Sequence, residues 1–333
     1  MTGPLVLGID GGGSKTLIAL ADESGRIVDR GRAGGINPLD NTAWRTLLEA
    51  ELERFGRIRN IAAVVAALPA YGEVEAISAA QRETIASVFP GVPQDVVNDV
   101  DAAHLGAFAG GAGILILSGT GSMAWARDAE GRSYRVGGWG DLVGDEGSSH
   151  WIGMRILSAI SQSIDGRTPP TALVDAVFAT LGLDLHDPMN ALEGWAAHIH
   201  SRRANIAALA PLASRLAEEG DAVAAAIIDA AADELARHVT AIGRLGGLAP
   251  DWSFAGGTFA SRPLREGVAK RLGRPPRRPI LPPIGGALLA AARRAGWPAD
   301  NHWIDELARA LGERTETAPA ADPAADRQPQ TTN

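Results

Sequence analysis

One pattern, an apolar strand followed by a glycine-rich turn and a returning strand, occurs twice in this sequence. In the first copy, the runs at 5–10 and 16–22 are typical of β-strands, and the letters GGGS lie between them. In the second copy, ILILS and SMAWARD flank the turn GTG. A repeated unit of this kind predicts two related lobes, each of which supplies one loop.

The remaining elements are typical of an α/β protein. A third strand is expected at 26–34, and the helix TAWRTLLEAELERFG, the buried strand IAAVVAALPA and the helix EVEAISAAQRETIASVF follow. From about residue 145 to Gly247 the spacing is almost entirely helical, which predicts a large helical insertion in the second lobe. The end of the chain, 315–333, is rich in Pro, Ala and Asp and poor in large apolar residues, so we expect a disordered tail.

Composition excludes several classes of protein. The 333 residues are 46% hydrophobic, which is enough for a sizeable core. The formal net charge is -8, so a surface that binds nucleic-acid phosphates is not expected. No apolar run reaches the ~18 residues that a membrane span needs, and we expect a cytoplasmic enzyme that acts on a small molecule. There are 0 cysteines, which excludes disulfides, thiolate zinc sites and iron–sulfur clusters from this sequence.

The two glycine turns are candidate phosphate-binding loops. Successive backbone N–H groups can bind one anion, and the missing Cβ atoms let phosphate oxygens approach the main chain. Two such loops suit a triphosphate, although a plain hairpin turn explains GGGS equally well. The stretch Gly8–Thr16 nearly fits the P-loop pattern, but Ser14 stands at a required glycine and a strand follows, so we reject the P-loop.

Carboxylates follow two of the expected strands. Asp10 ends an apolar strand, where a carboxylate is costly unless it meets a cleft, a cation or loop amides, and it is a candidate partner for Mg²⁺. Asp99 lies where a buried strand meets a helix, which suits either a general base toward a hydroxyl or a helix N-cap. Asp101 competes for either role.

The stretch GGWGDLVGDEGSSHW, residues 137–151, has the composition of a sugar-binding loop. It combines glycines and acids with the aromatic ring of Trp139. Carbohydrates are held by aromatic faces and by carboxylates that accept hydroxyl hydrogen bonds. A loop that merely caps the following helix is an equally good interpretation of these residues.

Taken in order, GIDGGGSKT, the Asn98-Asp99 pair, LSGTGS, GGWG with GDEGS, AGGT and PPIGGALLAA resemble the N-acetylglucosamine kinase and BadF/BadG/BcrA/BcrD ATPase family. This family is part of the sugar kinase, actin and heat-shock ATPase superfamily. The resemblance covers the chain up to about residue 312. It implies two actin-like, ribonuclease H-like lobes with an ATP and sugar cleft between them. The lobes would be 1–112 and 113–299, with a helix at 300–314 packing back on the first.

The resemblance also implies the residues of the site. For ATP it implies two phosphate loops, which are Gly11, Gly12, Gly13 and Ser14 in the first lobe and Gly119, Thr120 and Gly121 in the second. It also implies an adenosine-side turn at Gly256 and Gly257, and Asp10 as the partner of Mg²⁺. For the sugar it implies Asn37, Pro38, Ser122, Gly138, Trp139, Gly140 and Asp145. It implies Asp99 as the catalytic base, in preference to Asp101, because Asp99 directly follows Asn98. Gly285 and Gly286 match a glycine pair at a helix start.

The implied activity is ATP-dependent phosphorylation of an amino sugar, in which Asp99 accepts the proton of the attacking hydroxyl. GGWG with GDEGS resembles the N-acetylglucosamine enzymes most closely, so the expected product is the 6-phosphate; glucosamine and N-acetylmuramic acid remain open as substrates. A homodimer is also implied. An ATPase that activates a radical dehydratase would need cysteine-ligated iron–sulfur chemistry, which the sequence argues against. A sugar sensor without catalysis is the remaining alternative, and both phosphate loops and the candidate base argue against it.

Overall fold

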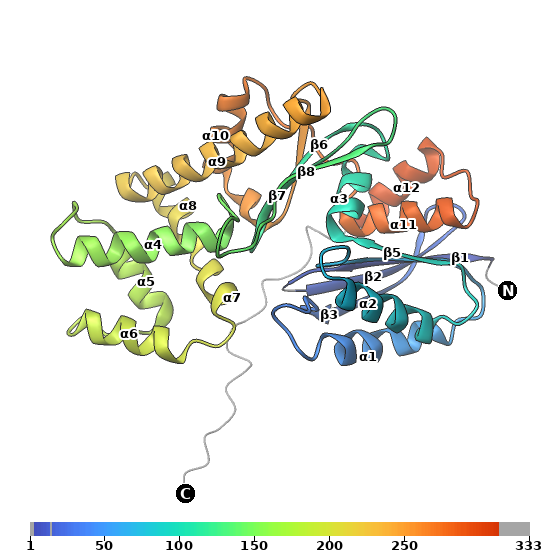
Figure 1. Cartoon of the computed structure of the whole chain (residues 1–333), viewed down its shortest axis with the longest axis horizontal. Helices are drawn as coiled ribbons and strands as arrows, with labels where there is room; N and C mark the ends of the chain where they lie inside the picture. Colours follow the sequence, from blue (N-terminus) through green and yellow to red (C-terminus); the bar gives the residue numbers. More distant parts are fainter. Residues whose placement is uncertain (1–2, 14, 313–333) are drawn as a thin grey trace, which may run out of the picture.

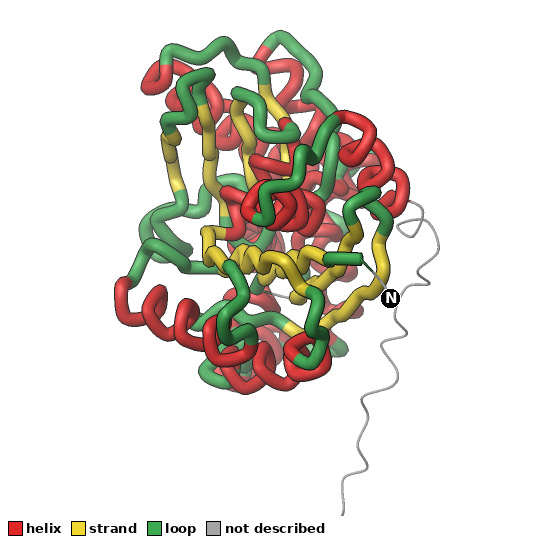
Figure 2. The backbone as a smooth tube through the Cα atoms, turned by 90° about the vertical axis from the view of Figure 1, so that its right-hand side faces the viewer, coloured by secondary structure: helices red, strands yellow, loops and turns green. Residues whose placement is uncertain are grey.

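The computed structural model describes residues 3–13 and 15–312, and it contains two β-sheets with helices packed around both (Figures 1 and 2). Ser14 and the expected disordered tail at 315–333 lie outside the described residues. Within the described part of the chain, no helix is both long and apolar enough to cross a membrane.

The first sheet has five strands in the order β3-β2-β1-β4-β5. Their bounds are β1 (Leu5–Gly11), β2 (Lys15–Asp22), β3 (Ile27–Gly34), β4 (Ile61–Leu68) and β5 (Gln94–Asn98). β1 is antiparallel to β2 and parallel to β4, and β4 is parallel to β5. β1 and β4 are buried at nearly every position, which agrees with their continuous apolar sequences.

Helices cover both faces of this sheet (Figure 1). The helices of one face are α1 (Trp44–Gly56) and α2 (Glu75–Val88), whose apolar side chains form one buried cluster with Leu7 and Ile9 of β1. The helices of the other face are α11 (Pro283–Arg294) and α12 (Asn301–Gly312), which cluster with Val6 of β1. Alternate side chains of one strand therefore enter different cores.

The second sheet repeats the pairing of the first. Its order is β8-β7-β6-β9, with bounds β6 (Gly113–Ser118), β7 (Ser122–Arg127), β8 (Ser133–Gly137) and β9 (Trp252–Ala255). β6 is antiparallel to β7 and parallel to β9, as β1 is to β2 and β4. The structure thus agrees with the expectation of two related units. β8 has no clear counterpart in the sequence analysis, because only two of its five residues, Tyr134 and Val136, are large and apolar.

The helical pattern expected after residue 145 corresponds to a block that packs on the second sheet (Figure 1). Its members are α4 (Ser149–Ile164), α5 (Leu173–Leu181), α6 (Pro188–His198), α7 (Arg202–Ala207), α8 (Ala210–Glu218) and α9 (Ala222–Gly246). After β9, the 3-10 helix η1 (Gly257–Ala260) and α10 (Arg262–Leu272) add apolar side chains to the same core. The longest, α9, lies against β6, β7 and β8.

The structure corrects one expectation about where the chain returns to the first lobe. The sequence analysis placed everything from 113 to 299 in the second lobe, but α11 packs on the first sheet, where Ile284 and Leu288 join the cluster of Val6. At Gly8 of β1, an added Cβ would lie 2.9 Å from a Leu288 side-chain atom, so the glycine makes room for this helix. α12 follows on the same side, and the Trp303 indole N–H donates to the Asp22 carbonyl at 3.2 Å.

Candidate active site

The carboxyl ends of the parallel strands β1, β4 and β5 meet at one edge of the first sheet. Asp10 is paired in register with Ala67 of β4, and Leu68 is paired with Asn98 of β5. Asp10 and Asp99 therefore come close enough for the charge on Asp99 to affect the pKa of Asp10. This edge is where ligands bind in open α/β sheets.

The helix that carries Asp99 begins with Asn98 as its N-cap. The Asn98 side-chain oxygen accepts a hydrogen bond from the Val100 backbone N–H at 3.1 Å, so Asn98 is the N-cap of α3 (Asp99–Phe108). Its amide also donates to the Tyr71 carbonyl at 2.8 Å. Asp99 is consequently the first helical residue, and its half-buried carboxylate interacts with the backbone N–H groups of Val100 and of Asp99 itself.

Both aspartates of this edge have raised pKa values. Burial raises the pKa of Asp99 to about 6, and the negative charge of Glu73 acts in the same direction. Burial, followed by the charge of Asp99, raises the pKa of Asp10 to about 7. A carboxylate with a pKa near neutrality suits proton transfer from a hydroxyl better than an ordinary surface aspartate does.

A cavity of about 150 Å³, called the sugar pocket below, brings most of the expected sugar-site residues together. Its lining includes Asn37, Asp99, Gly121, Ser122, Gly138, Gly140 and Asp145. Two residues that the sequence analysis did not select, Glu73 and Arg203, also line it. The pocket lies between the two sheets' loops and has the candidate base in its wall.

Two of the expected sugar-site residues do not line the sugar pocket. Pro38 is half-buried beside Asn37 but is not among the lining residues. Trp139 is 76% exposed, because Gly138 and Gly140 on either side have φ angles of 71° and 84° and turn the backbone around it. The Trp139 ring is therefore a surface group in this structure, and its contact with a sugar stays a prediction.

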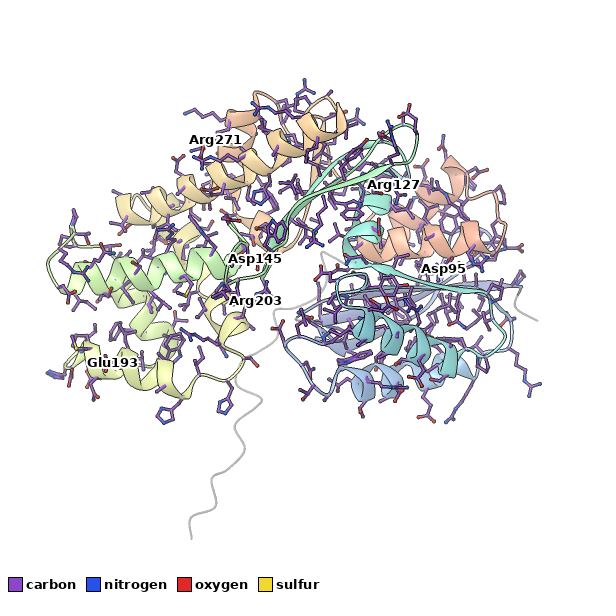
Figure 3. The ribbon with its side chains drawn as sticks, in the orientation of Figure 1. Asp95, Arg127, Asp145, Glu193, Arg203 and Arg271 are labelled. Atoms are coloured by element: carbon purple, nitrogen blue, oxygen red, sulfur yellow. The ribbon has the colours of Figure 1, made fainter. Side chains whose placement is uncertain are left out.

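Asp145 is the most constrained side chain of the pocket. It is 3% exposed and has a φ of 59°, a left-handed conformation that is uncommon for a residue other than glycine. Its carboxylate accepts from the Ser122 backbone N–H at 3.2 Å and from the Arg203 guanidinium (Figure 3). The Ser122 hydroxyl donates to the Glu146 carbonyl at 2.7 Å, which attaches this loop to the start of β7.

The two glycine turns open on a second, larger cleft of about 900 Å³, called the phosphate cleft below. Gly13 of the first turn and Thr120 of the second line it. The Gly119 N–H donates to the Gly121 carbonyl at 2.9 Å, which closes the second turn tightly. Two glycine loops from the two sheets therefore border one space, as a site for a triphosphate requires.

The glycines after β9 lie beside the second turn. Gly256 has a φ of 99°, and a Cβ there would overlap the Ser118 carbonyl oxygen, so only glycine fits. Gly257 lines a cavity of about 340 Å³ between η1 and α8, the place of the expected adenosine-side turn. The Thr258 hydroxyl donates to the Gly119 carbonyl at 3.2 Å and joins this turn to the phosphate loop.

Asp101, the rival of Asp99, is placed elsewhere. It forms an ion pair with Arg127 at 3.3 Å and lines a separate cavity of about 270 Å³ that includes Trp125 and Arg135. Asp101 is not among the residues that line the sugar pocket. This arrangement favours Asp99 as the group that reaches a bound hydroxyl.

Arg203 is the main residue that the sequence analysis missed. The sequence shows only Arg202 and Arg203 after a short helix, a pattern typical of a solvated helix end. In the structure the Arg203 side chain is 22% exposed and lines both the sugar pocket and the phosphate cleft. The decisive contact joins it to Asp145, 58 positions earlier, and no local pattern encodes such a pairing.

The residues present fit a magnesium ion that arrives with ATP. In the described chain, no group of three His, Cys, Asp or Glu side chains could hold a metal by itself. Mg²⁺ in nucleotide sites commonly needs one or two carboxylates, since water and phosphate oxygens complete its shell. Asp10, half-buried with its charge disfavoured by burial and by Asp99, is a carboxylate that a cation would stabilise.

Comparison with known proteins identifies the family to which this site belongs. The sequence matches the BadF/BadG/BcrA/BcrD ATPase family over residues 7–291. The chain is a member of this family. That membership confirms the family resemblance drawn from the glycine loops and the loop at 137–148.

Relatives of this family member include sugar kinases. The N-acetylmuramic acid/N-acetylglucosamine kinase of Clostridium acetobutylicum is 31% identical over 244 residues, which cover 71% of this chain and 78% of the relative. The N-acetyl-D-glucosamine kinase of Dictyostelium discoideum is 35% identical over 124 residues, or 37% of this chain and 38% of the relative.

A solved structure supports the fold assignment of this family member. The provisionally named N-acetylglucosamine kinase of Chromobacterium violaceum superposes with a TM-score of 0.68 at 25% identity, covering 86% of this chain and 98% of that one. The expected fold class, α/β with two actin-like lobes, is therefore confirmed.

Proposed function

We propose that this chain is an ATP-dependent amino sugar kinase that transfers the γ-phosphoryl group of ATP to the 6-hydroxyl of N-acetylglucosamine. The observation that carries the proposal is the position of the second glycine turn. Thr120 lines the phosphate cleft and its neighbour Gly121 lines the sugar pocket. A phosphate held by this turn therefore lies next to a group held in the pocket, as in-line transfer requires.

Asp99 acts as the general base in the proposed mechanism. Its carboxylate lines the sugar pocket, and a pKa of about 6 keeps it ionised at neutral pH yet basic enough to accept a proton. As the sugar oxygen attacks the γ-phosphorus, the hydroxyl proton passes to Asp99 and the bond to the ADP oxygen breaks. Mg²⁺, when bound, neutralises charge on the phosphate oxygens.

The binding residues divide between the two ligands. We assign sugar hydroxyls to Asn37 and Asp145, which line the same pocket as Asp99. The loops at 11–14 and 119–121 are assigned to the phosphates, the turn at Gly256 and Gly257 to the adenosine side, and Asp10 to the metal. The expected roles of Pro38 and Trp139 require these residues to approach the sugar when the cleft closes.

The choice of N-acetylglucosamine follows the resemblance of the loop at 137–148 and the names of the two relatives. N-acetylmuramic acid is the second candidate, because the Clostridium relative is named for both sugars. Glucosamine is the third. The cytoplasmic location and the homodimer stay predictions, which cell fractionation and size-exclusion chromatography with light scattering would test.

A coupled ADP-release assay tests the proposal. The purified chain is given ATP and Mg²⁺ with N-acetylglucosamine, glucosamine, N-acetylmuramic acid, N-acetylmannosamine, glucose or no sugar. We expect ADP release that depends on an amino sugar and is fastest with N-acetylglucosamine. Release that is independent of sugar would indicate an ATPase of the same family, and no release with any sugar would favour a sensor.

A further inference from the structure

Arg203 lines both cavities of the site, and Figure 3 shows it beside Asp145. It lies at the start of α7, in the helical insertion, and its Nη1 atom is 4.0 Å from a carboxylate oxygen of Asp40 in the first lobe. Among the described residues, Arg203 and Leu39 are the two that line both the sugar pocket and the phosphate cleft. Of these two, Arg203 carries a charge.

The guanidinium of Arg203 packs directly on the second phosphate loop. A Cβ added to Gly121 would lie 2.6 Å from the Arg203 Nη2 atom and 2.9 Å from an Asp145 oxygen. The ion pair occupies the place that a side chain at position 121 would need, so a Cβ there would displace the Arg203 guanidinium. The charge of Arg203 lies beside the backbone that separates the two cavities.

Arg203 has hydrogen-bonding capacity left after pairing with Asp145. Its Nη2 donates to Asp145, whereas its Nε is buried and donates to no atom in the described structure. Asp141 is 3.9 Å from Nε, and Asp40, from the first lobe, is 4.0 Å from Nη1. Both distances exceed a hydrogen bond, so an anion that enters the junction would find free N–H groups on a permanently charged side chain.

We propose that Arg203 is a catalytic residue of the kinase reaction, which contacts the phosphoryl group during transfer while it holds Asp145 in the sugar pocket. This inference rests on the proposed function. The reaction breaks the bond between the γ-phosphorus and the ADP oxygen, and that electron pair leaves with ADP. A bond from the phosphorus to the sugar oxygen forms, and the sugar proton goes to Asp99. Arg203 stays protonated throughout and neutralises charge on the equatorial oxygens.

The simpler alternative is that Arg203 only neutralises buried Asp145. The two roles make different predictions for kcat. A residue that only positions Asp145 affects sugar binding, and its removal has no further effect once Asp145 is changed. A residue that contacts the phosphoryl group lowers kcat whether or not Asp145 is present.

The test is a double-mutant cycle on kcat with Arg203→Ala, Asp145→Asn and the double variant. We expect Arg203→Ala to lower kcat by about 10² to 10³, and to lower it again by more than tenfold in the Asp145→Asn background. Millimolar guanidinium should restore part of the kcat of Arg203→Ala. A double variant with the kcat of Asp145→Asn alone, and no rescue, would overturn the proposal.

Two further variants keep the result interpretable. Arg237→Ala removes an arginine of α9 that is ion-paired with Asp233 at 2.6 Å and lines none of the described cavities, so its kcat should equal that of the wild type. Arg203→Lys retains the charge without the planar group, and its kcat should lie between those of the wild type and Arg203→Ala. A kcat of Arg203→Lys equal to that of the wild type would overturn the proposal, even if Arg203→Ala does not fold. An inactive wild type would contradict the proposed function instead.

Discussion

At the scale of the residue, the neighbours Asn98 and Asp99 have different positions in the site. Asn98 supplies the helix cap, and Asp99 is left with a carboxylate in the wall of the sugar pocket. Asp101 lies two positions on in the same helix, but its partner is Arg127 and its cavity is a different one. We therefore propose Asp99 as the base in preference to Asp101, because Asp99 lines the sugar pocket and Asp101 does not.

The first prediction concerns the base. Asp99→Asn should lower kcat by about 10² to 10⁴, because the amide cannot accept the hydroxyl proton, while the sugar dissociation constant changes little. Steady-state rates and calorimetric titration with the sugar provide the two numbers. Asp101→Asn is the matched control and should retain most of the activity. The reverse ranking of the two variants would make Asp101 the base.

The second prediction concerns pH. Because Asp99 must be ionised to act, and because burial raises its pKa to about 6, kcat/KM should fall about tenfold per pH unit below pH 6. The charge of Glu73 contributes to this rise, so Glu73→Gln should lower the pKa and move the acid limb to lower pH. Activity that stays constant down to pH 5 in the wild type would contradict this role for Asp99.

Sequence and structure differ most at single residues. The carboxylates at strand ends and the glycines of both turns could be predicted, because their chemistry is tied to local patterns. Arg203 and Glu73 could not, since each reaches the pocket through contacts distant in sequence. The expected contact of Trp139 with a sugar also depends on the conformation of its loop. The sequence does not determine that conformation, because the flanking glycines Gly138 and Gly140 can adopt many backbone angles.

At the scale of the element, α11 packs against α3, the helix that begins with the proposed base Asp99. Gly286 of α11 lies so close to α3 that a Cβ would overlap the Ala102 carbonyl oxygen and lie 2.7 Å from the Gly106 nitrogen. The glycine pair noticed in PPIGG is therefore explained by helix packing. Periodicity predicted both helices. The packing partner of α11 could not be predicted, because it depends on the room that Gly8 of β1 and Gly106 of α3 leave for this helix.

The third prediction tests this contact. Gly286→Ala should destabilise the fold by about 1–3 kcal/mol, because the methyl group forces two buried backbones apart. Gly194→Ala is the control, since a Cβ at this helical glycine of α6 meets no atom within 4 Å, and it should be neutral or stabilising. Urea midpoints of the three proteins measure the effect. Equal midpoints for both variants would refute the packing role of Gly286.

At the scale of the whole molecule, the two sheets share the same strand pairing (Figure 1), and loops from both line the phosphate cleft. Leu39 and Leu142 both line the phosphate cleft, from opposite lobes, yet they are 58% and 92% exposed. Large apolar side chains at facing positions gain burial if the lobes approach each other. The repeated strand–turn–strand pattern predicted the lobes, but the cleft between them depends on tertiary packing.

The fourth prediction follows from these exposed leucines. Addition of N-acetylglucosamine together with a non-hydrolysable ATP analogue should reduce the radius of gyration measured by small-angle X-ray scattering, because closure buries the cleft walls. Leu142→Ser should weaken closure and raise the fraction of ATP hydrolysed without sugar phosphorylation. An unchanged scattering curve with both ligands bound would show that the lobes do not close.

The most direct test of the central claim is to identify the product. ³¹P NMR of the wild-type chain incubated with ATP, Mg²⁺ and N-acetylglucosamine should show a new phosphomonoester signal, coupled to the C6 protons, that appears in step with ADP. The same reaction with Asp99→Asn should show almost none. If the wild type yields only ADP and inorganic phosphate, or a phosphate on a different sugar position, the account of an amino sugar 6-kinase is contradicted.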